Sequence, residues 1–148
     1  MTCLTRRVRL ALVLLTGAAA LAGASCGSSK VPVYPVRGQV LYQGKPAEGA
    51  LVIFHPTSGA IPPGAPMLPN GRVQADGSFT LTTYTDNDGA PAGEYVVVIL
   101  WPSGGTEGDE ESSGSHDRLQ GRYGDVARSP IKREVQPGEN VLEPIQLK

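Results

Sequence analysis

The sequence has little of what catalytic and metal-binding proteins depend on. It contains two histidines, two cysteines and one tryptophan among 148 residues. A zinc site needs three or four converging His, Cys, Asp or Glu ligands, but His55 and His116 lie far apart and no HExxH pattern occurs. The one GxSxG match, residues 23–27, lies across the end of the predicted signal peptide, and no such segment marks the nucleophile turn of a hydrolase within residues 35–148. These shortages predict no catalytic residues, no metal site and no cofactor.

One short segment does contain the residue types of a hydrolase triad. Ser115, His116 and Asp117 follow one another directly. Known triads are assembled from distant segments, so that nucleophile, base and orienting carboxylate form one chain of hydrogen bonds. Adjacent residues cannot line up in this way, and we interpret the segment as part of a polar loop.

Positive charge is scarce as well. Thirteen Lys and Arg stand against fourteen Asp and Glu, and three of the thirteen, Arg6, Arg7 and Arg9, lie close to the N-terminus. The remainder of the chain is therefore mildly acidic, with no basic patch interleaved with aromatic residues. Nucleic acid is not an expected partner.

The N-terminus has the pattern of an export signal. After the three arginines, an apolar run from Leu10 to Ala24 ends in small residues. A basic head, a short apolar middle and a small-residue end are typical of a secretory signal peptide. The run is shorter than the ~20 apolar residues that a spanning helix needs. We therefore predict a signal peptide over residues 1–25 and an exported protein.

The segment LAGASCGSS, residues 21–29, resembles a bacterial lipobox, in which the cysteine is lipidated and becomes the new N-terminus. Cys26 follows three small residues, although Gly23 stands where a lipobox usually has leucine. Cleavage by an ordinary signal peptidase after Ala22 or Ala24 also fits the small-x-small pattern and would release a soluble form. Both processing routes remain open from the sequence.

Cysteine usage favours lipidation. Cys3 leaves with the signal peptide, so Cys26 has no partner for an internal disulfide. We predict lipidation of Cys26, with a free thiol or an intermolecular bridge as alternatives. Residues 26–34 would form a flexible tether. The expected location is the cell envelope, at its periplasmic or outer-membrane face.

Long helical periodicity is missing beyond the tether, whereas 19 glycines and 13 prolines punctuate the chain. Short apolar runs alternate with turn residues, which indicates an all-β sandwich or barrel. About seven strands over residues 35–148 fit one domain, an immunoglobulin-like or transthyretin-like antiparallel β-sandwich. The segment ADGS at 75–78 predicts a hairpin turn. The row from Tyr95 to Trp101 predicts a strand covered on both faces, by the core and by a neighbouring strand or loop.

The end of the chain predicts two further strands around the turn PGEN, residues 137–140. Pro144 indicates an edge position or a bulge there. An edge strand from Val141 to Leu147 could bind a partner by strand addition. The inward-facing candidates in this region are Ile131, Val135, Val141, Leu142, Ile145 and Leu147.

Several short motifs resemble a known domain. They are Gly-x-Val at 38–40, Gly-x-Pro at 44–46, Ala-Asp-Gly-x-Phe at 75–79 and Gly-Glu-Tyr at 93–95. Residues 35–148 thereby resemble the carboxypeptidase regulatory-like, or transthyretin-like (prealbumin-like), domain found in many short bacterial lipoproteins. The resemblance implies a β-sandwich without established catalytic residues, because the regulatory domain accompanies the peptidase domain and does no chemistry itself.

The segment TDNDGAPAGEY, residues 85–95, looks like part of a calcium loop. An EF-hand loop needs oxygen ligands at positions one, three and five, glycine at six and glutamate at twelve. With Gly89 at position six, positions one and twelve fall on Tyr84 and Tyr95. Both ends fail, and we interpret the segment as a connection between two strands, for which Asp, Asn, Gly and Pro are suited.

Exposed aromatic side chains are the remaining binding candidates. Tyr95 and Trp101 belong to the most apolar run and are interpreted as core. Tyr84, just outside a strand, is the best exposed candidate for stacking against a sugar ring.

We therefore expect a non-catalytic, lipid-anchored envelope protein with a structural or adhesive role. Its partners would be the membrane, through the lipid, and an envelope protein or polysaccharide. A carbohydrate- or peptide-binding module is the alternative, and an enzyme ranks below it.

Overall fold

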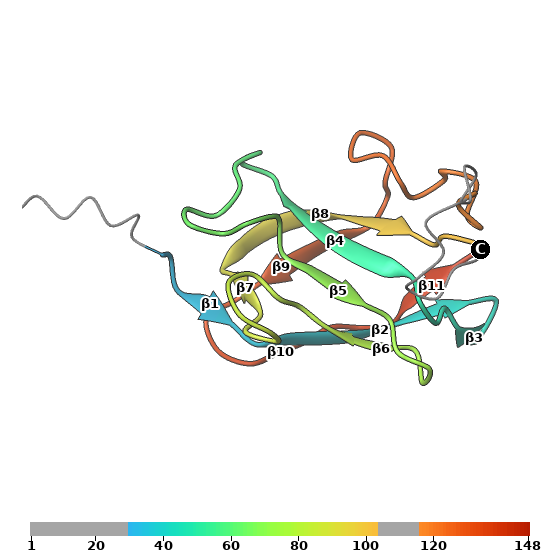
Figure 1. Ribbon diagram of the computed structural model, residues 1–148, viewed down its shortest axis with the longest axis horizontal. Coiled ribbons are helices and arrows are strands. Elements are labelled where there is room, and N and C mark those ends of the chain that lie inside the picture. Colours follow the sequence, from blue (N-terminus) through green and yellow to red (C-terminus); the bar gives the residue numbers. More distant parts are fainter. Residues whose placement is uncertain (1–29, 104–115) are drawn as a thin grey trace, which may run out of the picture.

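The computed structural model describes residues 30–103 and 116–148 (Figure 1). These residues form eleven short β-strands and no helix, which confirms the prediction of an all-β chain. The strands are β1 (Val33–Tyr34), β2 (Val36–Tyr42), β3 (Lys45–Pro46), β4 (Leu51–Pro56), β5 (Asn70–Arg72), β6 (Ser78–Thr80), β7 (Ala90–Pro91), β8 (Gly93–Leu100), β9 (Lys132–Val135), β10 (Asn140–Val141) and β11 (Ile145–Leu147). They outnumber the seven expected because several are two-residue pairings.

One sheet has the order β5-β4-β8-β9 and is antiparallel throughout. Its centre is the pairing of β4 with β8, in which Val52 lies opposite Ile99 and Phe54 opposite Val97. All four of these side chains are fully buried. Because side chains alternate along a strand, the apolar residues of both strands face the same side of the sheet.

The other large sheet is built around β2. β6 and β3 pair antiparallel along one side of β2, whereas β10 and β11 pair parallel along the other. The expectation of a purely antiparallel arrangement is therefore wrong. The turn at 136–139 does not close a hairpin, because β9 belongs to the first sheet while β10 joins the second. A small third pairing joins β1 to β7.

The predicted turn at 75–78 is present, but its two strands separate into different sheets. The amide of Gln74 donates to the carbonyl of Ser78 at 2.8 Å, and the Asp76 carboxylate accepts the Ser78 amide at 2.9 Å. β5 then pairs with β4, and β6 pairs with β2. An isolated bridge between Asn70 and Thr82 still links the two strands. The chain from β5 to β6 thus connects the two sheets along one edge.

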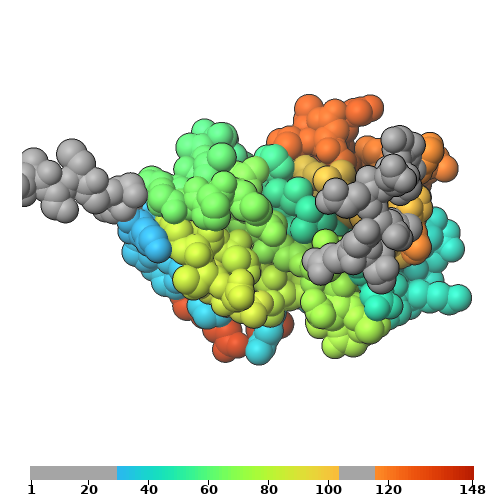
Figure 2. Space-filling model, viewed as in Figure 1, coloured from blue at the N-terminus to red at the C-terminus, as the bar shows by residue number. Residues whose placement is uncertain are grey.

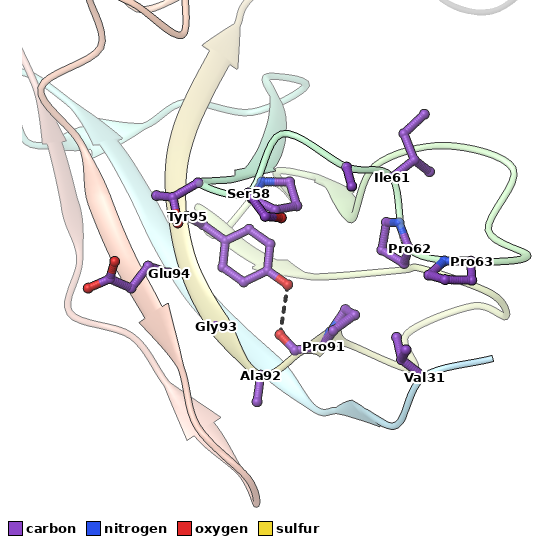
Figure 3. A pocket seen from close by; sticks show the side chains of 13 residues that line it. Val31, Ser58, Ile61, Pro62, Pro63, Pro91, Ala92, Gly93, Glu94 and Tyr95 are labelled. Carbon is purple, nitrogen blue, oxygen red and sulfur yellow. Dashed lines mark hydrogen bonds between the residues drawn. The ribbon is translucent and has the colours of Figure 1, made fainter. Parts of the chain in front are cut away.

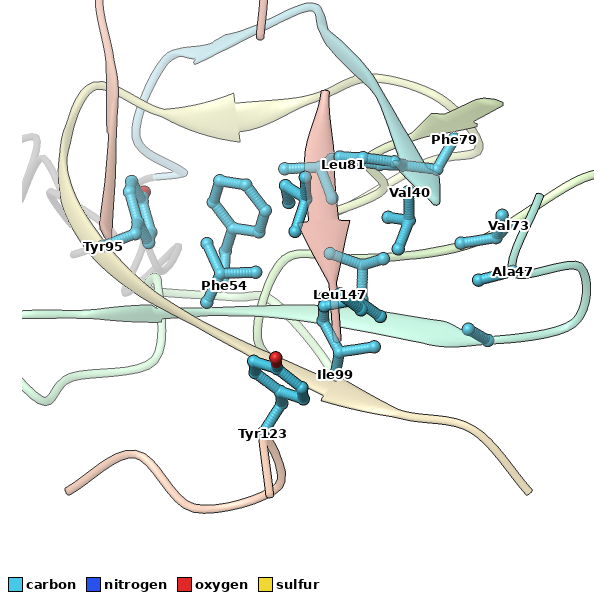
Figure 4. Close-up of a cluster of buried hydrophobic side chains, with 14 of the residues drawn as sticks. Val40, Ala47, Phe54, Val73, Phe79, Leu81, Tyr95, Ile99, Tyr123 and Leu147 are labelled. Carbon is cyan, nitrogen blue, oxygen red and sulfur yellow. The ribbon is translucent and has the colours of Figure 1, made fainter. Parts of the chain in front are cut away.

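The hydrophobic core lies between the two large sheets, a β-sandwich-like arrangement (Figure 4). Val40 and Phe79 come from one sheet, and Phe54 and Ile99 from the other. Tyr95 packs against Phe54 with ring centroids 5.5 Å apart. The two sheets therefore bury a single shared cluster of side chains.

The inward-facing candidates near the C-terminus are mostly correct. Val135, Ile145 and Leu147 are buried, and Ile131 and Leu142 pack against the core in part. Val141 is the exception, with 65% of its surface exposed. Val141 pairs with Arg37 while Ile145 pairs with Val40, so this strand has one more residue than β2 over the same stretch. Residues 142–144 therefore lie opposite only residues 38–39 and form a bulge. Of the two alternatives predicted for Pro144, an edge position or a bulge, the register shows the bulge.

β8 is covered on its second face by the chain that follows Asp117. Ser129 donates its hydroxyl to the carbonyl of Val97 at 2.5 Å, and the amide of Ile99 donates to the carbonyl of Tyr123 at 3.0 Å. Val98 on this face is therefore 3% exposed. The prediction that both faces of this strand are covered holds at Val98, but Val96 is only partly buried and Leu100 on the same face is 36% exposed.

Candidate functional site

The described chain begins at one end of the molecule and finishes at the other. Lys30 lies beside β1, and the C-terminus lies at the opposite end of the long axis (Figure 1). Cys26, the predicted lipidation site, is outside the described residues, and its lipidation stays a prediction. No helix among residues 30–103 and 116–148 is long and apolar enough to cross a membrane.

Tyr84 connects the start of the described chain to a proline-rich loop. The amide of Val31 donates to the Tyr84 hydroxyl at 3.1 Å, and this hydroxyl donates to the carbonyl of Pro63 at 3.0 Å. The ammonium group of Lys30 lies 5.0 Å from the centroid of the Tyr84 ring, within cation–π distance. Lys30 covers one face of this half-buried ring, and a sugar stacking on that face would have to displace it.

A hollow of about 320 Å³ lies beside this contact (Figure 3). Val31, Ile61, Pro62, Pro63 and Tyr95 are among its lining residues, and Glu94 is the charged one. The Tyr95 hydroxyl donates to the carbonyl of Pro91 at 2.7 Å at its base. Burial, and secondarily the nearby Tyr84, raise the pKa of Tyr95 to about 12. The hollow is therefore mainly apolar, with a phenol that stays neutral.

The loop that looked like half a calcium site is organised around Asp88. One carboxylate oxygen accepts the amide of Thr83 at 2.7 Å, and the other accepts the amides of Tyr84 at 2.9 Å and Thr85 at 3.0 Å. Burial acts to raise the pKa of Asp88, but these three backbone hydrogen bonds outweigh it, so the pKa lies below its ordinary value. The carboxylate braces the turn that precedes β7.

Two neighbours complete this connection. The hydroxyl of Thr80 donates to the side-chain oxygen of Asn87, and Thr83 donates its hydroxyl to the carbonyl of Gly89 at 2.6 Å. Asn87 and Gly89 both have positive φ angles, 61° and 98°. Asn and Gly adopt this backbone most readily. The interpretation of residues 85–95 as a connection between strands agrees with this geometry for residues 85–89, whereas the rest of the segment contains β7 and the start of β8.

Asp117 uses its carboxylate in the same way. Its oxygens accept the amides of Trp101 at 2.9 Å, Leu119 at 3.1 Å and Gly121 at 2.8 Å. Ser115 lies outside the described residues. The carboxylate of Asp117 is thus used to bind backbone amides of Trp101, Leu119 and Gly121.

The described residues contain no group of three or more His, Cys, Asp or Glu that could hold a metal ion. His55 lies half-buried on β4, where burial lowers its pKa. The carbonyl of His116 accepts two hydrogen bonds, from the amide and the hydroxyl of Ser103, which follows β8. The two histidines are not brought together into one cluster.

A second aromatic surface lies at the end opposite the tether. Tyr42 and Trp101 meet edge to face with centroids 5.6 Å apart, and the Arg118 guanidinium lies 4.9 Å from the Trp101 ring. With Lys45 and Glu48 they line a hollow of about 610 Å³. Trp101 is 8% exposed, as its interpretation as core requires. Sequence reasoning missed this grouping, because Tyr42 and Trp101 are 59 positions apart.

No protein-family model matches this chain, and no match was found among curated proteins or solved structures. The resemblance to the carboxypeptidase regulatory-like domain therefore stays a prediction drawn from the four motifs. The all-β fold itself is established by the strands and their pairings.

Proposed function

We propose that this protein is a lipid-anchored, non-catalytic β-sandwich of the transthyretin-like or immunoglobulin-like class, with a structural or adhesive role at the cell envelope. The observation that carries the proposal is the position of the chain start. The first described residues and β1 lie at one end of the long axis, and the C-terminus and β3, whose Lys45 and Pro46 line the Trp101 hollow, lie toward the other (Figure 1). A lipid on Cys26 would present the far end away from the membrane.

The use of the acidic side chains supports a structural role. Asp88 and Asp117 each accept three backbone amides, and Asp76 and Asp125 each accept the amide two residues further on. A carboxylate that satisfies backbone donors stabilises its own turn. These four aspartates therefore serve the loops that join the strands.

The experiment is a Cys26→Ser substitution in the full chain, followed by membrane fractionation and mass analysis of the N-terminus. We expect the wild-type protein to carry a lipid and to sediment with the membrane, and the variant to be released. Cys3→Ser is the matched control, because Cys3 would leave with the signal peptide. Membrane retention of Cys26→Ser, together with an unmodified wild-type N-terminus, would refute the proposed anchor.

A carbohydrate- or peptide-binding role is the second candidate. The partly exposed ring of Tyr42 packs against the buried Trp101 and shares a hollow with Lys45, Glu48 and Arg118, so an aromatic surface lies beside charged groups. Sugar sites commonly use this combination of an aromatic face and polar side chains. Binding on a glycan array that is lost in Tyr42→Ala and kept in Tyr84→Ala would assign the site to this hollow. Loss only in Tyr84→Ala would assign it to the tether end.

A further inference from the structure

We propose that the proline-rich segment 56–69 is a membrane-contact surface that lies against the lipid headgroups to which the chain is anchored. The inference rests on the proposed lipid anchor at Cys26. It adds a defined surface and a fixed orientation to that anchor, which a flexible tether alone would not supply.

The segment has the chemistry of a surface that meets lipid. Its fourteen residues, PTSGAIPPGAPMLP, include no charged side chain. Ile61 is 53% exposed and Met67 is 55% exposed. Figure 2 shows the segment, in green, forming the outer surface beside the first described residues, in blue. Exposed apolar patches on otherwise polar proteins commonly mark contacts with a partner or a membrane.

The exposed side chains project from a loop whose ends are held in place. The amide of Phe54 donates to the carbonyl of Pro69 at 2.8 Å, and the amide of Ala65 donates to the carbonyl of Pro62 at 3.0 Å. Pro62 and Pro69 are buried. Ile61 and Met67 are therefore presented to the outside by a braced loop, so contact with lipid requires little ordering of the chain.

The chain start is hydrogen-bonded to this same segment. Val31, Tyr84 and Pro63 form a continuous relay, from the Val31 amide to the Tyr84 hydroxyl and on to the Pro63 carbonyl. Val31 and Ile61 also line one hollow. The direction from which the tether arrives is thus fixed relative to the apolar loop.

The length of the tether keeps this surface close to the bilayer. The predicted tether, residues 26–34, is shorter in the structure, because Val31 is hydrogen-bonded and Val33–Tyr34 form β1. Four peptide units separate Cys26 from Lys30, and they span at most about 14 Å when fully extended. The headgroup region adds roughly 5–8 Å on each side of the hydrocarbon core. If Cys26 lies at the boundary of the hydrocarbon core, the headgroup region takes up about half of this span. Lys30 would then lie within about one further headgroup thickness of the membrane surface, with the apolar loop beside the point of attachment.

Lys30 and Tyr84 fit the same environment. The Lys30 ammonium group lies over the Tyr84 ring, at the entry of the tether. Lysine can place its charge among lipid phosphates while its stem covers apolar surface, and tyrosine rings favour the same interfacial layer. Glu94, the acidic residue of the hollow, points away from Ile61 (Figure 3) and also lines a second hollow with Lys132, Arg133 and Glu134.

The test places a fluorophore at single cysteines in the full-length, membrane-purified protein. Ile61→Cys and Met67→Cys report on the proposed surface, and Val126→Cys is the matched control. Val126 is also an exposed apolar residue, 41% accessible, but it lies in the segment that covers β8. Each variant is reconstituted into vesicles of phosphatidylethanolamine and phosphatidylglycerol, with and without brominated acyl chains. Flotation with the vesicles is measured in parallel.

We expect a blue-shifted emission and quenching by brominated lipid at positions 61 and 67, and neither at 126. Floating protein with equal signals at all three positions would overturn the membrane-contact surface while leaving the anchor in place. Protein that does not float would overturn both. A shift at 61 and 67 that depends on protein concentration in detergent, and not on lipid, would assign the surface to a second copy of the chain and overturn the inference.

Discussion

Replacing Gly89 with alanine is expected to cost far more stability than the same change at another glycine with a similar backbone. Gly89 has a φ of 98°, in a region that L-residues rarely adopt. A Cβ at this position would also overlap the carbonyl group of Tyr34 and lie 2.9 Å from the Cα of Pro35. These are backbone atoms, so they can move only if β1 moves.

The size of the effect follows from two contributions. An alanine held in this backbone region costs about 1–3 kcal/mol, offset by about 0.4–1 kcal/mol from the lower entropy of the unfolded chain. Relieving the overlap requires either β1 to move, which disturbs its pairing with β7, or Gly89 to move, which disturbs its hydrogen bonds with Leu81 and Thr83. At about 1 kcal/mol for each of two hydrogen bonds, the total loss for Gly89→Ala is roughly 2–5 kcal/mol.

Gly138→Ala is the matched control. Gly138 has a φ of 111°, but an added Cβ would meet nothing within 4 Å. Its expected loss is therefore only the backbone contribution, about 1–2 kcal/mol. The free energy of unfolding of both variants is measured by chemical denaturation. Equal losses in the two variants would show that the close approach of Gly89 to Tyr34 does not contribute to stability, and the reasoning would be refuted.

Three further predictions concern the loops around Tyr84. Asp88→Asn should lower the free energy of unfolding by about 2 kcal/mol at neutral pH, and Asp86→Asn by much less. Folding lowers the pKa of Asp88 below 3.8. The Asp88 carboxylate therefore stabilises the fold above pH 3.8, and this stabilisation is lost as the pH falls through the pKa of Asp88 in the folded protein. Acid titrations of the free energy of unfolding in which Asp88→Asn matches wild type would contradict this. Tyr84→Phe should speed tryptic cleavage after Lys30, since the Val31 relay is lost, and an unchanged cleavage rate on a gel would argue against the relay. Tyr95, with a pKa of about 12, should stay protonated in the folded protein when the pH exceeds 10. Because the unfolded phenol ionises near pH 10, wild-type stability should fall between about pH 10 and 12, and the fall should be smaller in Tyr95→Phe. An ordinary titration of the Tyr95 phenol, followed by ultraviolet absorbance, would disprove the burial effect.

The alternating patterns of the strands were predictable because burial on one face imposes a period of two. Ile145 and Leu147 were assigned correctly to the core for this reason. The position of Val141 was not predictable. The bulge around Pro144 shifts the register by one residue, and this exposes the side chain that strict alternation would bury.

For the candidate sites, too, the sequence predicted one part and the structure supplied another, as Asp88 shows. The sequence excluded an EF-hand at residues 85–95, because both ends of the loop lack ligands. It did not reveal that the carboxylate accepts three amides, since the hydrogen-bond geometry of a turn depends on how its flanking strands are held. Tyr84 was selected as an exposed ring, and the structure places it in a relay between Val31 and Pro63.

The sequence by itself determined the all-β class, the turn at 75–78 and the inward-facing side of Ile145 and Leu147, and it left an edge position or a bulge open at Pro144. These follow from local backbone preferences and from the alternation of side chains, which neighbouring residues decide. Only the tertiary structure decided that β5 and β6 enter different sheets, that β10 and β11 run parallel to β2, and that Val31, Tyr84 and Pro63 meet at one end of the molecule. These relations join residues distant in the chain, and they depend on which strands the shared core brings together.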